Sequence, residues 1–289
     1  MVMKHSGKSI SIIIPVYNEA RRIRACLDSI AAQTDMPDEV IVVDNNSTDD
    51  SVAIAKEYPF VKVVSESRQG RGFAYAAGFD AASGDILGRI NGDSRLEPDW
   101  VARVRHTFTE SPGIGGLTGP AYTDTLPATH MFMTTLWSRC YFRWNEAVQR
   151  INTLWGANMA ISSESWRAVR SGVCFDDKLV HDDQDLAYLL NGHGFRIIRD
   201  NKILVTTYGQ HYHLWPKLHE YMRRRGTTKR LHKRKGTLRK PGAIVLPWWV
   251  VSHVRVWGTP LLAIFLGVSL LRSLPDMIFG ERQRTYIED

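Results

Sequence analysis

Short apolar runs alternate with stretches of helical spacing over the first hundred residues of the chain. Four runs rich in Ile and Val read as strands: Ser9–Val16, Asp38–Val43, Val61–Ser65 and Asp85–Ile90. Runs without polar alternation are typical of parallel strands buried on both faces. The stretches between them predict helices: Glu19–Ala32, Ser51–Tyr58 and Gly70–Ala82. This order predicts an α/β fold with a mostly parallel central sheet and ligand sites at the carboxyl ends of the strands.

The pattern is mixed between Glu97 and about Leu214. We expect a helix after Pro98, a glycine-rich turn over Gly113–Gly119 and a helix near Asp183–Leu190. No linker separates this region from the first, so it reads as a continuation of the same domain.

Composition narrows the class of protein. The chain has 289 residues, 44% hydrophobic and 23% charged, which excludes intrinsic disorder and collagen-like or coiled-coil architecture. Three scattered cysteines are too few for a disulfide framework, and the first residues lack the apolar region of a signal peptide. We therefore expect the body of the protein in a reducing cytoplasm.

The basic charge is concentrated in one segment. The net charge is +7, but Lys217–Lys240 holds eleven Lys and Arg against one acid, which leaves −3 for the rest. A hydrophobic stretch, Ala243–Leu271, follows directly. Basic residues beside an apolar segment favour anionic lipid at the cytoplasmic face of the membrane. A nucleic-acid-binding module is the alternative from another class, although this segment lacks interleaved aromatic residues for base stacking.

The apolar stretch is short for a membrane span. Its uninterrupted run, Val256–Leu271, has 16 residues, whereas a span needs about 20. An interfacial or re-entrant helical hairpin fits better. Packing of these helices on the catalytic body or on a second subunit, as in a homo-oligomer, is the alternative.

Polar residues follow the first, second and fourth predicted strands, and the first set is Tyr17-Asn18-Glu19. Asp44 and its polar neighbours could bind a nucleobase and ribose, or could serve as turn and cap residues. Asn91-Gly92-Asp93 could hold a divalent ion that bridges two phosphates. Asn-Gly alone is also typical of a hairpin, but Pro98 and the apolar spacing after it predict a helix instead.

Five motifs occur in an order and spacing that resemble family 2 nucleotide-sugar glycosyltransferases with the GT-A fold. They are SIIIPVYNE, EVIVVDNNSTDDS, NGD followed by LEPDW, GANMAIS, and HDDQDL followed by Gly194-Phe195-Arg196. The resemblance covers about Ser9 to Thr207. It implies a Rossmann-like domain with a nucleotide-sugar-binding half (1–96) and an acceptor or catalytic half (97–215), followed by a basic, hydrophobic tail (216–289).

The resemblance implies roles for residues of the first half. The donor-binding residues would be Pro15, Tyr17, Glu19, Asp44, Arg71 and Asn91. Asp93 matches the last acid of the family's DXD motif and would bind Mg²⁺ or Mn²⁺, while Asn91 replaces the first acid of that motif. His211 or His213 could add a metal or phosphate contact, or could be an exposed loop histidine. Tyr75-Ala76 stand where the family often has Arg-Asn.

Asp183 matches the second acid of the family's acidic pair, the general base of an inverting transfer. Asp182, Trp155, Gly156 and Asn158 would lie toward the acceptor or the transferred sugar. Without the resemblance, the acids of residues 182–185 would read as stabilising a helix N-terminus.

The sequence thus predicts a membrane-associated, metal-dependent, inverting glycosyltransferase of the hexosyltransferase class. Its partners would be a nucleoside diphosphate sugar, an anionic membrane surface and the hydroxyl of a lipid-linked or cell-surface glycan; no nucleic acid is expected. Transfer to polyprenyl phosphate is the close alternative. A phosphate needs no base, so Asp183 favours a hydroxyl.

Overall fold

The computed structural model describes residues 7–123, 152–208 and 214–238. The chain divides into two compact units, one of residues 1–210 with 222–240 and one of residues 211–221 with 241–289. All contacts discussed below lie within the first unit. Of the second unit, only residues 214–221 are described, as the beginning of a helix.

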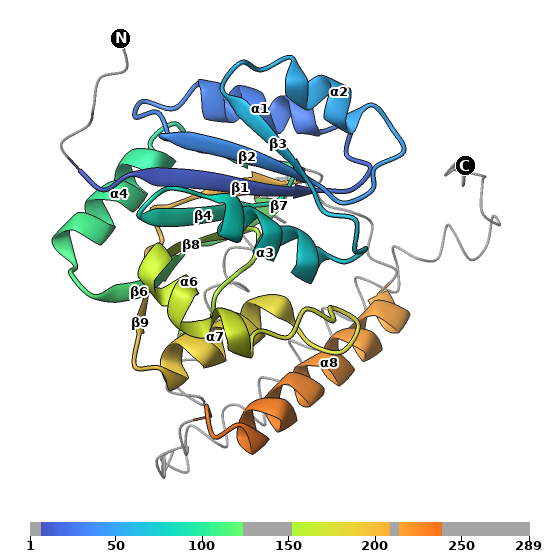
Figure 1. The fold of residues 1–289 in the computed structure, drawn as a ribbon, viewed down its shortest axis with the longest axis vertical. Coiled ribbons are helices and arrows are strands. Elements are labelled where there is room, and N and C mark those ends of the chain that lie inside the picture. Colours follow the sequence, from blue (N-terminus) through green and yellow to red (C-terminus); the bar gives the residue numbers. More distant parts are fainter. Residues whose placement is uncertain (1–6, 124–151, 209–213, 239–289) are drawn as a thin grey trace, which may run out of the picture. The chain divides into compact units, whose positions relative to one another are not determined.

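A seven-stranded sheet forms the centre of the first unit (Figure 1). Its strands are β1 (Ile10–Val16), β2 (Glu39–Asp44), β3 (Val61–Ser65), β4 (Ile86–Ile90), β6 (Ile114–Thr118), β8 (Asn158–Ser162) and β9 (Arg196–Arg199). Their order in space is β3-β2-β1-β4-β8-β6-β9. The first four are mutually parallel, as are β6 and β9, whereas β8 is antiparallel to both of its neighbours. The predicted mostly parallel α/β sheet is confirmed.

Helices cover both faces of this sheet. One face packs against α1 (Ile23–Ala31), α2 (Ser51–Lys56) and α4 (Trp100–Glu110), and the other against α3 (Arg71–Ala81), α6 (Ser163–Val169) and α7 (Asp182–Gly192). Successive residues of β1 alternate between the two cores, because side chains of a strand point to opposite faces. Ile12 and Ile14 belong to the first core and Ile13 to the second.

A small second sheet lies next to the acidic loop Asn91-Gly92-Asp93. Its strands are β5 (Ser94–Leu96), β10 (Val205–Thr207) and β7 (Ala121–Thr123), in the order β5-β10-β7. β5 pairs with β10 and not with β4, so the Asn-Gly pair does not form a hairpin. The helix predicted after Pro98 is confirmed as α4.

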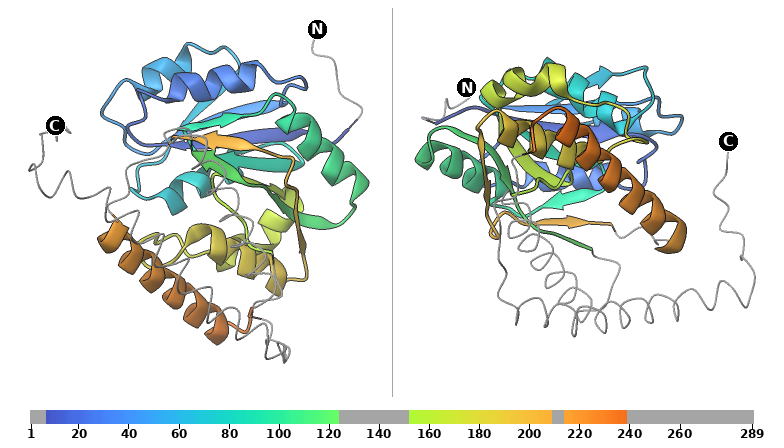
Figure 2. Two further views of the ribbon diagram at one scale, coloured as in Figure 1. Left: turned by 180° about the vertical axis from the view of Figure 1, so that it is seen from behind. Right: turned by 90° about the horizontal axis from the view of Figure 1, so that it is seen from below.

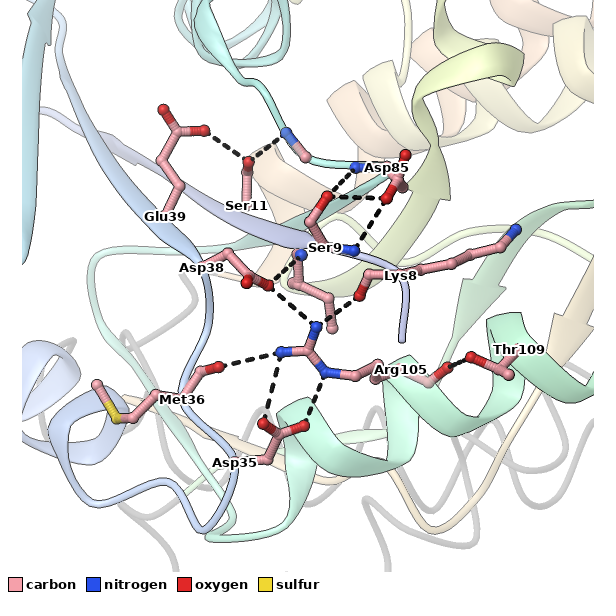
Figure 3. Close-up of polar contacts among 12 residues, drawn as sticks. Lys8, Ser9, Ser11, Asp35, Met36, Asp38, Glu39, Asp85, Arg105 and Thr109 are labelled. Atoms are coloured by element: carbon pink, nitrogen blue, oxygen red, sulfur yellow. Dashed lines mark hydrogen bonds and ion pairs between the residues drawn. The ribbon is translucent and has the colours of Figure 1, made fainter. Parts of the chain in front are cut away.

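A buried arginine holds the segments that enter β1 and β2 (Figure 3). Arg105 Nε donates to Asp35 Oδ2 at 2.8 Å, and Arg105 Nη1 donates to Asp38 Oδ2 at 3.0 Å. The same Nη1 reaches the carbonyl of Lys8, and Nη2 donates to the carbonyl of Met36 at 3.1 Å. Every nitrogen of this guanidinium group has a partner. The arginine therefore fixes where the two strands begin.

The turn predicted over Gly113–Gly119 is wrong, because β6 occupies most of this segment. Its glycines allow close packing instead of chain reversal. A Cβ on Gly115 would lie 2.4 Å from Phe195 Cβ, and one on Gly119 would lie 2.2 Å from the carbonyl oxygen of Ile203. No side chain fits at such distances.

The basic segment forms most of a long helix, α8 (Leu214–Arg234). From Met222 onward α8 lies alongside α7 in both views of Figure 2. Its exposed side chains include Arg223, Lys229, Arg230, Lys233 and Arg234. Within the described ranges, no helix combines the length and apolarity needed to cross a membrane. The predicted apolar segment Ala243–Leu271 lies outside the described residues.

Candidate active site

The carboxyl ends of β1 and β2 lie side by side, because the strands are parallel and Val16 pairs with Asp44. Pro15 and Asp44 are half-buried there, and Tyr17 is 53% exposed. The structure thus brings together three residues predicted to bind the donor. An exposed aromatic ring beside a carboxylate suits a nucleobase, which offers a face for stacking and N–H groups for hydrogen bonds.

Asn45, which the sequence analysis did not assign, positions the next part of the site. Its side chain is buried, and Nδ2 donates to the carbonyl oxygens of Glu66 and Arg68, both at 2.8 Å. Its Oδ1 accepts the N–H of Gly70 at 2.8 Å. Since Gly70 directly precedes α3, this amide determines where Arg71 stands. The signal in the sequence was an asparagine directly after the carboxylate that ends a buried strand.

The acidic loop after β4 packs against Glu19. A Cβ on Gly92 would lie 3.3 Å from Glu19 Cγ, so glycine permits the close approach of loop and side chain. Burial raises the pKa of Glu19, and the nearby Asp93 carboxylate raises this pKa further. Asn91 is half-buried in the same loop, and the Asp93 carbonyl accepts the N–H of Tyr208 at 3.3 Å. Two neighbouring carboxylates that repel each other form a suitable environment for a cation.

This loop does not by itself make a complete metal site. Across the described segments, no group of three or more His, Cys, Asp or Glu side chains could hold a metal ion. An ion at Asp93 would therefore take most of its ligands from phosphate oxygens and water, as Mg²⁺ commonly does. His211 and His213, the other predicted metal residues, lie outside the described residues.

Arg71 connects the donor side to α7. Its backbone N–H donates to Asp177 Oδ2 at 3.2 Å, and its Nε lies 3.7 Å from Asp182 Oδ2. Its side chain is 46% exposed. The guanidinium group is thus anchored at one edge and accessible at another, which suits an anionic ligand.

Asp182 has protein partners in place of the predicted acceptor or sugar. Arg89 Nη2 on β4 donates to Asp182 Oδ2 at 2.6 Å, and the two side chains are only 1% and 6% exposed. Burial alone would raise the pKa of Asp182, but the charges of Arg71 and Arg89 hold it well below its usual range. Asp182 is therefore a buried, ionised group.

Asp183 is the more accessible member of the pair and is half-buried. Its Oδ2 accepts the backbone N–H of Gly156 at 3.3 Å, which connects the base predicted on α7 to the predicted Trp155-Gly156 loop. Trp155 is also half-buried. Burial raises the pKa of Asp183, and the neighbouring Asp182 carboxylate raises it further. A carboxylate with increased proton affinity, held by one N–H, has the chemistry of a general base.

The structure does not place Asn158 where a sugar could reach it, which corrects the prediction for this residue. Its side chain is fully buried. Oδ1 accepts Trp100 Nε1 at 2.9 Å, while Nδ2 donates to the carbonyl oxygens of Pro120 and Ile203, both at 2.8 Å. The amide instead connects α4, β8 and the segment before β10.

Asp185, two residues after Asp183, contacts α8. Its Oδ2 accepts the N–H of Cys174 at 3.0 Å, and its Oδ1 lies 2.8 Å from His232 Nε2 of α8. Both side chains of this hydrogen-bonded pair are fully buried. Thr228 Oγ1 of the same helix accepts the N–H of His181, directly before α7. No motif in the sequence predicted this contact of His232, which lies within the basic segment.

Comparison with known proteins identifies the family. The model of the family described as Glycosyl transferase family 2 matches residues 11–168. An uncharacterised glycosyltransferase from Nostoc sp. is 33% identical over 111 residues, which cover 37% of this chain and 34% of that protein. The glycosyltransferase AglE from Haloferax volcanii is 36% identical over 107 residues, 35% of each chain. The matched region spans about a third of the length of these curated relatives.

The fold is also similar to a solved structure, the mannosyltransferase PcManGT from Pyrobaculum calidifontis in complex with GDP-Man and Mn²⁺. The TM-score is 0.58 at 20% identity, covering 93% of this chain and 81% of that one. At this identity the likeness supports the GT-A-like α/β fold and not a particular substrate. Because the family model matches more than half of the sequence, the chain belongs to glycosyl transferase family 2.

Proposed function

We propose that this protein transfers a hexose from a nucleoside diphosphate sugar to an acceptor hydroxyl, with inversion at the anomeric carbon. The observation that carries the proposal is Asp183, a half-buried carboxylate of raised pKa beside the Gly156 backbone. Arg71 lies 3.7 Å from the adjacent Asp182, so the donor side reaches this base. In the proposed reaction Asp183 takes the hydroxyl proton while the acceptor oxygen attacks opposite the leaving diphosphate.

The other residues would bind and orient the donor. Tyr17 and Asp44, at adjacent strand ends, would take the nucleobase, with Pro15 lining the pocket. Arg71 would place its accessible guanidinium group against the diphosphate. Together these contacts would hold the sugar between the donor edge and Asp183.

Asp93 and Asn91 would hold Mg²⁺ or Mn²⁺. A bound divalent ion would neutralise the charge that develops on the leaving diphosphate. The residues fit such an ion in chemistry, because the Asp93 carboxylate lies near Glu19, whose pKa it already raises, and Asn91 belongs to the same loop. The Mn²⁺ bound by the structurally similar mannosyltransferase supports the same expectation.

We further propose a hydroxyl of a lipid-linked or cell-surface glycan as acceptor, at the cytoplasmic face of a membrane. The exposed basic side chains of α8 support an anionic lipid surface as partner. Each such side chain near the lipid contributes about 1 kcal/mol to binding. Changing Lys229, Arg230, Lys233 and Arg234 to Gln should weaken binding to anionic vesicles far more than to neutral vesicles. Equal binding of parent and variant to anionic vesicles would contradict this role of α8.

The donor assignment is tested by thermal unfolding of the full chain with UDP-, GDP- and dTDP-sugars, each with Mg²⁺, Mn²⁺ or EDTA. A ligand that binds the native state at 100 times its dissociation constant stabilises that state by about 2.7 kcal/mol. One nucleotide series should raise the melting temperature, and EDTA should reduce the increase. In Asp93→Ala the metal-dependent part should disappear. No increase with any sugar nucleotide would contradict the proposed function.

A further inference from the structure

A buried arginine of β4 lies against the two carboxylates that begin α7. Arg89 is 1% exposed, and its Nη2 donates to Asp182 Oδ2 at 2.6 Å. The guanidinium carbon lies 4.6 Å from the centre of the Tyr75 ring, which covers one of its faces. Arg89 Nε and Nη1 are buried and have no hydrogen-bond partner in the described part of the chain. The charge of this arginine is therefore directed at one hydrogen-bonded carboxylate.

The same guanidinium group supports the loop that holds Asp183. A Cβ on Gly156 would lie 3.1 Å from Arg89 Nη2 and 3.2 Å from Arg89 Cζ, so the Gly156 backbone packs directly on this arginine. The N–H of Gly156 donates to Asp183 Oδ2. Arg89 thus contacts Asp182 directly and Asp183 through one residue, which allows a single side chain to control both acids.

Two adjacent carboxylates in a partly buried site do not ionise independently, and the surrounding charges decide which one keeps a proton. The charged and titratable groups that act on this pair include Arg89, Arg71 and His181, and the buried phenol of Tyr75 also lies close enough to interact with Asp182. Arg89 and Arg71 lie close to Asp182, whereas Asp183 accepts a hydrogen bond from the neutral N–H of Gly156. The positive charges therefore favour ionisation of Asp182 more strongly than that of Asp183.

We propose that Arg89 is a positioning residue that keeps Asp182 ionised and so makes Asp183 the member of the pair that takes up the acceptor proton. The proposal rests on the proposed role of Asp183 as the base. It deepens that role, because it assigns to a residue of β4 the choice between two acids on α7. Arg89 itself touches neither donor nor acceptor in this scheme.

The experiment is a carboxyl titration of the full chain labelled with [γ-¹³C]aspartate and followed by NMR, with Asp183→Asn used to assign the signals. Asp182→Asn removes a negative charge and leaves Arg89, so the midpoint of Asp183 should fall by about 1 pH unit or more. Adding Arg89→Met in that background removes the positive charge, and the midpoint should rise again. Asp182→Asn leaves the buried charge of Arg89 without its carboxylate and should lose stability, whereas the double variant removes both charges of the pair and should fold. Urea denaturation shows whether each variant is folded over the pH range of the titration.

Two further variants test the choice of acid in the intact pair. In Arg89→Met, Asp182 should take up a proton at a higher pH than in the parent, whereas Arg89→Lys should keep Asp182 ionised. Arg105→Met is the matched control, since it removes another buried, aspartate-paired arginine far from α7 and should leave both midpoints unchanged. An unchanged Asp183 midpoint between Asp182→Asn and the double variant would overturn the proposal.

The pH dependence of donor hydrolysis separates this proposal from the proposed function. The probe is the sugar nucleotide that gives the largest thermal shift. The acidic limb of kcat should move with the NMR midpoint of Asp183, while KM for the donor stays the same. If the NMR midpoints move and the kcat profile does not, Arg89 controls the pair but Asp183 is not the base. If the NMR midpoints do not move, the inference about Arg89 is wrong whatever the activity.

Discussion

Two buried arginines of this protein have opposite surroundings. At the edge where β1 and β2 begin, Arg105 shares hydrogen bonds with Asp35, Asp38 and two backbone carbonyls, and each of its nitrogens is paired (Figure 3). Near the other end of the sheet, Arg89 has one hydrogen-bonded carboxylate, and two of its nitrogens have no such partner among the described residues. The first is a satisfied network and the second is an incomplete one.

The contrast shows where the fold is optimised for stability and where it is not. Buried polar groups are normally hydrogen-bonded, because an unpaired one loses its solvation without compensation. The Arg105 network follows this rule. The site around Arg89 departs from it and places Asp182 and Asp183 next to each other, which suits proton transfer more than stability.

The largest effect should come from Asp183→Asn, which keeps the shape of the side chain and removes the proposed base. Transfer should fall by roughly 10²- to 10⁴-fold, the usual range for a positioned general base. The thermal shift produced by the donor should persist, because Asp183 does not bind the nucleotide. Retained transfer would contradict the assignment of the Arg89 site to proton transfer. It would point to a phosphate acceptor or to another base.

Arg105→Met should have the next largest effect, on stability and not on chemistry. Breaking a buried ion pair by removing one partner costs about 3 kcal/mol. The side chain of Arg105 is 9% exposed and that of Asp35 is 18% exposed, so solvent offers little compensation. Urea denaturation should show the loss, while kcat per folded molecule stays that of the parent. A fall in kcat without a loss of stability would contradict the assignment of the Arg105 network to stability and of the Arg89 site to chemistry.

The helices and strands that depend only on the local sequence pattern were predicted from the sequence. The four apolar runs appear as β1 to β4, and the acids near residue 183 begin α7. The resemblance to the family pointed to the ends of β1, β2 and β4, which are parallel neighbours in the structure. The segment Gly113–Gly119 was misjudged because its glycines permit contact with Phe195, which is about 80 residues away, and local pattern carries no information on such a contact.

Individual residues of the candidate site could be picked out from the sequence, but the residues that they contact could not. The side-chain amide of Asn158 could bind a sugar hydroxyl. Only the fold shows that this amide already forms hydrogen bonds with Trp100 and two backbone carbonyls. Arg89 is a charged residue within an apolar run that was predicted to be buried. A buried charge needs a partner, but the sequence does not show which residue that partner is. The partner, Asp182, lies 93 residues further along the chain.

Gly156→Ala should have a smaller effect, and it tests the contact of the Gly156 backbone with Arg89 and Asp183. The added Cβ would lie 3.1 Å from Arg89 Nη2, so the loop or the guanidinium group must move by a few tenths of an ångström. We expect the hydrogen bond from residue 156 to Asp183 to lengthen and kcat to fall by several-fold, with stability lowered by about 1 kcal/mol. An unchanged pH profile together with unchanged kcat would show that this backbone contact does not hold the base.

The smallest expected effect is a gain of stability in Asp183→Asn, the variant with the lowest activity. Folding raises the pKa of Asp183, so its ionised form disfavours the native state once pH rises through that pKa. Asparagine cannot ionise, so the variant should be more stable than the parent near pH 7, by about 1 kcal/mol. The difference should vanish below pH 3.9, which is about the pKa of an aspartate in the unfolded chain.

Folding lowers the pKa of Asp182, so Asp182→Asn should instead reduce stability near pH 7. Urea denaturation of both variants at several pH values measures the two signs, and equal signs would contradict the division of roles between these acids.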